Sequence, residues 1–117
     1  MNSLQADLKP NYGSLVVART IGQFVVVSPG IHAGITFLFE AIEDDRIKIR
    51  VKRSGFQDHV FCGPVGAYFE VWILGKYVRL TVTRFGAKCR LAITAPNEWS
   101  IVRGELIGEG LPLLMEP

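Results

Sequence analysis

The side chains that most often carry catalysis or bind metals are few in this chain and stand apart. The two histidines, His32 and His59, fall in turn or linker sequence, without a cysteine or carboxylate at the spacing of a zinc site. Three consecutive carboxylates, Glu43 to Asp45, separate two apolar runs, which is typical of a solvated hairpin tip. The sequence contains no glycine-rich phosphate loop, nucleophile elbow or Ser/His/Asp order. We therefore expect no enzymatic activity, no metal and no cofactor.

Basic side chains offer a different chemistry, the binding of phosphates or base edges. The chain has 13 Lys and Arg against 11 Asp and Glu, so any nucleic-acid site must be a local patch. One basic strip is formed by Arg46, Lys48, Arg50 and Lys52, which alternate with aliphatic residues. Such a strip could bind the phosphates of a nucleic acid, and it is equally typical of a solvent-exposed strand face whose charges prevent aggregation. Both interpretations stay open at this point.

β-Strands are the elements that must position these residues. Runs rich in Val, Ile, Phe, Thr and Trp recur along the chain, several with period two, and no ten-residue stretch has a helical apolar period. The expected strands are the runs at 14–20, 23–28, 35–42, 46–52, 68–74, 77–85, 88–94 and 99–106. The predicted fold class is all-β, with little or no helix.

Length and composition indicate one domain with its own core, since 117 residues include 49% hydrophobic residues. No run approaches the roughly 18 apolar residues of a membrane span, and the opening "MNSLQADLKP" lacks the order of a secretion signal. We expect a cytoplasmic protein without a membrane partner. In that compartment Cys62 and Cys89 are expected to be small buried hydrophobes rather than a disulfide.

The chain also repeats itself at an offset of about 43 or 44 residues. Residues 21–51 and 65–93 share one order of features: an apolar-Gly pair, a strand, a turn, a second strand, a polar turn and a basic-alternating strand. A tandem duplication explains this order, although evenly spaced strands can also look alike by accident. We expect a single domain, 1–117, of two repeats at about 14–53 and 60–107, with a linker at about 54–59 and a tail at 108–117.

Two stretches resemble the carbon storage regulator (CsrA/RsmA) family. "LVVARTIGQFVVV", residues 15–27, is similar to the opening strand pair of that family, and "VRLTVTRFGAKCRLAITAPNEWSIVRGEL", residues 78–106, is similar to its later strands and closing segment. The resemblance implies an intertwined β-sandwich or barrel-like assembly, here a pseudo-dimer made by one chain. It also implies a post-transcriptional regulator that binds GGA-type RNA loops, in messenger leaders or small regulatory RNAs, with no DNA partner expected.

The resemblance implies one composite RNA site rather than two. The first repeat keeps the opening arginine as Arg19, whereas Gly63 and Pro64 replace the basic pair in the second repeat. The closing strand shows the reverse, because only the second repeat keeps Ala-Pro and a terminal arginine, Arg103. The expected RNA-binding residues are Val17, Ala18, Arg19, Thr20, Ala95, Pro96, Asn97, Ile101, Val102 and Arg103.

The same implied geometry predicts how the halves fit together. Neither half should fold alone, and the strand at about 14–20 should lie beside about 98–104, with a parallel orientation favoured. Arg84 is expected to lie away from the site. Trp99 has no counterpart in the family pattern, so it either stacks on a base or, as we favour, belongs to the core. A second function stays open, namely a protein-interaction scaffold or decoy that no longer binds RNA.

Overall fold

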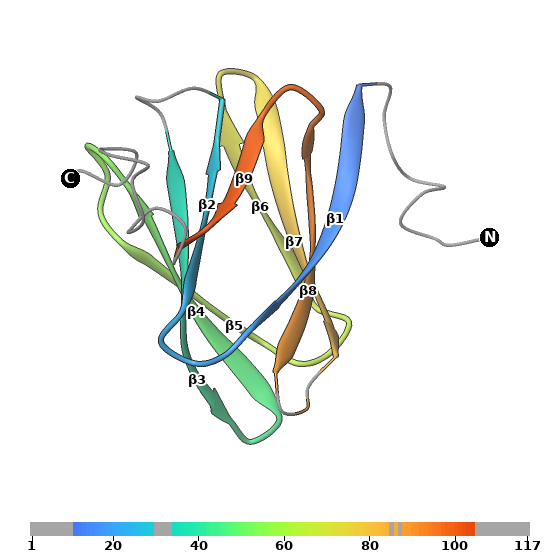
Figure 1. The fold of residues 1–117 in the computed structure, drawn as a ribbon. Coiled ribbons are helices and arrows are strands. Elements are labelled where there is room, and N and C mark those ends of the chain that lie inside the picture. Colours follow the sequence, from blue (N-terminus) through green and yellow to red (C-terminus); the bar gives the residue numbers. More distant parts are fainter. Residues whose placement is uncertain (1–10, 30–33, 85, 87, 105–117) are drawn as a thin grey trace.

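The computed structural model describes residues 11–29, 34–84, 86 and 88–104, and the regular elements of this part are nine β-strands (Figure 1). The strands are β1 (Tyr12–Arg19), β2 (Phe24–Ser28), β3 (Ile35–Glu43), β4 (Arg46–Arg53), β5 (His59–Gly63), β6 (Tyr68–Ile73), β7 (Lys76–Arg84), β8 (Cys89–Pro96) and β9 (Ser100–Arg103). The predicted all-β class is confirmed. The strand that the sequence did not indicate is β5, which is short and ends at a Gly-Pro pair.

The strands form two antiparallel sheets that face each other across one core (Figure 1). The first has four strands in the order β1-β8-β7-β6, and the second has five in the order β5-β4-β3-β2-β9. No ladder joins the two sheets among the described strands, so the barrel-like closure expected from the sequence is not found. In the same part of the chain, no helix is long and apolar enough to cross a membrane.

Strands are exchanged between the two halves of the chain. β1, from the first half, pairs with β8 of the second half, and β5, from the second half, pairs with β4 of the first. The last strand, β9, pairs with β2. The predicted pairing of the first strand with residues 98–104 is therefore wrong, because β1 and β9 each take a different neighbour, and both ladders are antiparallel rather than parallel.

Two glycine turns reproduce the sequence repeat in the backbone. Gly22 and Gly66 have φ of 92° and 93°, a region that favours glycine. The N–H of Gly22 donates to the carbonyl of Phe39, and the N–H of Gly66 donates to the carbonyl of Val82, both at 2.7 Å. The chain therefore enters β2 and β6 through turns of the same geometry.

The core lies between the inner faces of the sheets. β4 shows the pattern that its sequence predicts: Ile47, Ile49 and Val51 are buried while the basic residues between them face outward. The same alternation places aliphatic residues of β7 and β8 in the core. Trp99 is buried against this cluster, which confirms the core interpretation of that residue.

Short connections decide which sheet edges lie together. Residues 20–23 join β1 to β2 and residues 97–99 join β8 to β9, so the β1 edge of one sheet lies over the β9 edge of the other (Figure 1). At the opposite side of the sandwich, residues 64–67 join β5 to β6, and the β6 edge lies over the β4–β5 side. Each side therefore combines one edge from each sheet.

Candidate nucleic-acid interface

The β1 residues of the predicted site divide between the two faces of their strand. Val17 and Arg19 are buried, whereas Ala18 is half-buried, as is Thr20, which directly follows β1. Because side chains alternate along a strand, the residues that flank Ala18 both point to the inner face. The second outer-face residue in this region, Val16, is exposed at 56%.

Arg19 does not present its guanidinium to solvent, which corrects its expected role as an RNA contact. Its relative exposure is 4%, and its Nε–H donates to the carbonyl of Ala18 at 2.9 Å. Cys89, its register partner on β8, is also buried. The equivalent residue in the other repeat is Gly63, whose added Cβ would lie 2.7 Å from the Cβ of Ala67. At both positions the residue is therefore packed against its neighbours in the protein.

The Ala-Pro segment lies at the far end of β1 from Arg19. Pro96 is opposite Tyr12 in the ladder, and the N–H of Asn97 donates to the carbonyl of Asn11 at 2.7 Å. Ala18 lies six positions after Tyr12, which corresponds to roughly 20 Å along an extended strand. Ala95 and Pro96 are buried and Asn97 is exposed, so only the turn after the proline is open to solvent.

Among the predicted site residues on β9, Arg103 is the exposed one. Ile101 packs against the core, Val102 is half-buried, and Arg103 is exposed opposite Val25 at the start of β2. This position lies near the turn that follows β1. The predicted residues therefore form two groups: the Ala-Pro turn at one end, and the end of β1 with Arg103 toward the other.

A cluster of cations that the sequence did not indicate lies beside this second group. Arg84 on β7 is the register partner of Arg90 on β8, and Arg90 is the register partner of Ala18 on β1. Arg84, Arg90 and the nearby Lys88 are all exposed, and none forms an ion pair within the described part of the chain. The expectation that Arg84 lies away from the site is wrong. We call these three residues the cationic hairpin.

The equivalent hairpin of the first repeat has the opposite character. Residues 40–48 contain four carboxylates and two cations, whereas residues 83–90 contain three cations and no carboxylate. The partners that correspond to Arg84 and Arg90 are Ala41 and Lys48, and Lys48 pairs with Glu43 at 3.5 Å. The fold is repeated, but the two hairpins differ in charge, because carboxylates outnumber cations in the first and only cations are present in the second.

The basic strip of β4 is largely neutralised by carboxylates. Arg50 donates from Nε to Glu40 and has its Nη1 3.7 Å from Asp58, and Lys52 is 3.8 Å from the same Asp58. The hydrogen bond from Arg50 lowers the pKa of Glu40 below its ordinary value. This arrangement favours a solvent-exposed charged strand face over a surface that binds phosphates.

Within the part of the chain that the structure describes, the cationic hairpin has no ion pair to break before it binds an anionic chain. Like charges on directly opposed positions of two strands repel each other, and a bound phosphate removes that repulsion. The neighbouring edges, β1 and β9, have no further strand beside them among the described residues, so part of their backbone N–H and C=O groups is open for hydrogen bonds. Cations beside open strand edges suit single-stranded nucleic acid better than a rigid duplex.

No group of three or more metal-binding side chains is found within the described residues, and both cysteines are free thiols there. Cys89 is buried as expected, but Cys62 is exposed, which corrects that part of the prediction. Comparison of the chain with protein-family models, with curated proteins and with solved structures gave no match.

Proposed function

We propose that this chain is a single-chain pseudo-dimer of the carbon storage regulator type that binds a single-stranded RNA loop at one composite site. The exchange of β1 and β5 between the halves supports the pseudo-dimer, as do the two equivalent glycine turns. The resemblance of residues 15–27 and 78–106 to that family supports a GGA-type loop as the ligand. Binding to a messenger leader in the cytoplasm would alter translation or messenger stability.

The observation that carries this proposal is the charge difference between the two hairpins. Arg84, Lys88 and Arg90 are exposed beside the end of β1 and form no ion pair within the described residues, whereas the first-repeat hairpin carries its own carboxylates. One side of a repeated fold is thus suited to a polyanion and the other is not. One RNA per chain follows from that asymmetry.

The roles within the proposed site differ by residue. Arg84, Lys88 and Arg90 bind phosphates and fix the RNA along the β1 side. Arg103, on the neighbouring β9 edge, has the planar fork that suits a base edge or a phosphate. Open backbone groups near Ala18 and Val102 supply hydrogen bonds to splayed bases. Arg19 supports the site by packing and does not touch RNA.

A protein-interaction scaffold is the second candidate function, and the burial of Arg19 favours it. That residue was the clearest basic feature of the resemblance, and it is not available to a ligand. Binding measurements separate the two functions. Fluorescence anisotropy with a labelled GGA-loop hairpin, a scrambled-loop hairpin and two or more salt concentrations should give loop-selective, salt-dependent binding if the RNA proposal is right. Equal, weak binding of both hairpins at low salt would favour the scaffold.

A further inference from the structure

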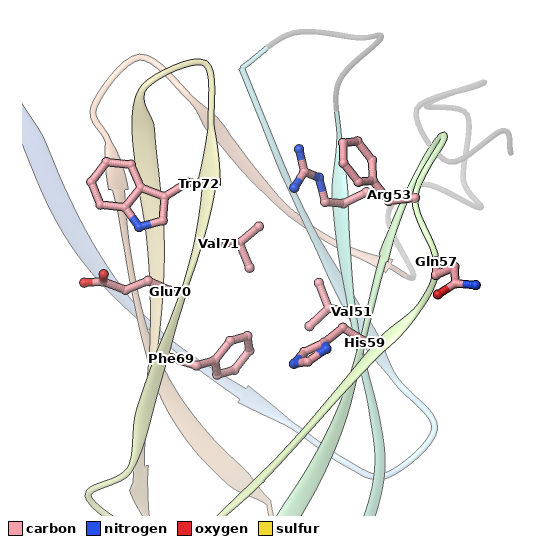
Figure 2. Close-up of a pocket in the computed structure, with 9 residues that line it drawn as sticks. Val51, Arg53, Gln57, His59, Phe69, Glu70, Val71 and Trp72 are labelled. Atoms are coloured by element: carbon pink, nitrogen blue, oxygen red, sulfur yellow. The ribbon is translucent and has the colours of Figure 1, made fainter.

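The side of the sandwich opposite the β1 and β9 edges contains a groove beside an edge that has no neighbouring strand among the described residues. β6 pairs with β7 on one side only among the described strands. The groove has a volume of about 360 Å³ and lies between β6 and the segment that runs from the end of β4 into β5. In Figure 2, Phe69 and Val71 face Val51 and His59 across this space.

The fold contains its own example of a strand in the equivalent place. β6 corresponds to β2 because both follow the equivalent glycine turns, and β2 has β9 on its outer side. On β2 the residue opposite Val27 is Ile101, which packs into the core. A strand added antiparallel to β6 in the same register would place an aliphatic side chain opposite Val71, at the groove.

The edge of β6 is suited to strand addition. Residues 68–73 contain no proline or lysine, which usually protect an exposed edge, and their one charged residue, Glu70, is paired with Arg79. Tyr68 and Trp72 are exposed at 59% and 55%. The ring centroids of Trp72 and Tyr77 are 5.4 Å apart, and the ring of Tyr77 stacks on that of Tyr12 with centroids 4.4 Å apart. These ring contacts hold the Trp72 side chain in place on the edge.

Charge around the groove indicates the character of the incoming strand. Arg53 lies over the ring of Phe56 at 4.0 Å and has no ion-pair partner among the described residues. Glu70, the carboxylate on the β6 side, is already paired with Arg79 at 2.7 Å. An acidic residue next to the apolar anchor would therefore find a free cation in Arg53 and little repulsion from Glu70.

We propose that the β6 edge binds an extended segment of a partner protein by strand addition, the segment carrying alternating aliphatic residues and a carboxylate that pairs with Arg53. Backbone hydrogen bonds to β6 provide affinity, and the aliphatic anchor over Val71 provides selectivity. This surface is separate from the proposed RNA site, because the groove is lined by none of the proposed RNA-binding residues and β6 is the sheet edge opposite β1.

The experiment is an NMR titration of the full chain with blocked synthetic peptides of alternating isoleucine and serine. One peptide carries glutamate at both ends, a second carries lysine at both ends, and a third replaces the central serines by proline to remove backbone donors. The acidic peptide should shift the amide signals of residues 68–73 and bind about threefold to fivefold more tightly than the basic one. Arg53→Glu should reverse that preference, while Leu15→Lys, on the β1 edge of the same sheet, should change nothing.

Several results would overturn the proposal. Shifts confined to β1 or β9, no binding at millimolar peptide, or equal binding of the proline peptide would each exclude strand addition at β6. A concentration-dependent dimer joined through β6 would make a second copy the occupant. Contacts between residues 105–117 and β6 in the free chain would make the protein's own tail the occupant.

Discussion

Arg84 lies directly opposite Arg90 across the β7–β8 ladder, and both side chains are exposed. Directly opposed like charges on neighbouring strands destabilise a sheet. In the first repeat the same two positions hold Ala41 and Lys48, and Lys48 has Glu43 as a partner. The arginine pair is therefore an unfavourable feature of the free protein that an anionic ligand would relieve.

Replacing Arg90 should weaken RNA binding and reduce its dependence on salt. Arg90→Ala removes one phosphate contact, so the slope of log affinity against log salt should fall by about 0.7 for a single strand. Anisotropy titrations at several salt concentrations measure this slope. The matched control is Lys48→Ala at the equivalent position of the first repeat, and an equal loss in both variants would contradict a one-sided site.

Replacing Arg19 should change stability and leave the salt slope as it is. Arg19 is buried, so Arg19→Ala leaves a small cavity and removes its hydrogen bond to the Ala18 carbonyl. We expect a cost of about 1–3 kcal/mol in the free energy of unfolding. Urea unfolding of the variant measures this cost. If Arg19→Ala keeps the stability but reduces the salt slope as Arg90→Ala does, the side chain reaches RNA and its structural role is refuted.

Acid should weaken the contact between β3 and β4. The hydrogen bond from Arg50 lowers the pKa of Glu40 in the folded state, so this carboxylate stabilises the fold above its ordinary pKa. That contribution is lost as the pH falls through the lowered value. Glu40→Gln should therefore show a smaller drop in melting temperature on acidification than the unmodified chain. A parallel drop in both proteins would show that the pair contributes nothing.

The two cysteines should react at different rates. Cys62 is exposed on β5, whereas burial removes Cys89 from solvent and raises the pKa of its thiol. A thiol reagent should modify one cysteine per native chain quickly and the second only after unfolding. Mass spectrometry of the labelled peptides identifies the site. Rapid modification of both thiols in the native protein would contradict the packing of β8 against the core.

The sequence predicted strand positions well because period-two patterns and turn residues are local. β4 is the clearest case, since its aliphatic residues are buried as their alternation requires. β5 was missed because its five residues end at Gly63, directly before Pro64, and have little alternation. Local pattern also could not place the last strand, whose neighbour is β2 rather than β1.

The candidate site was harder to predict than the strands. The direction of Arg19 could not be read from "LVVAR", because apolar residues occupy both faces of that run. The meeting of Arg84 with Arg90 depends on a bulge between Val82 and Arg84, which shifts the register by one residue. A bulge of this kind has no clear signal in a single sequence. The cationic hairpin is therefore visible only once the ladder is known.

The number of RNA molecules bound per chain tests the central claim most directly. Isothermal titration calorimetry of the full chain with a GGA-loop hairpin should give one site per chain, with the scrambled-loop hairpin binding much more weakly. Arg90→Ala should weaken that site, and Lys48→Ala should leave it unchanged. Two equal sites per chain, or no heat with either hairpin at low salt, would contradict a single composite RNA site beside β1.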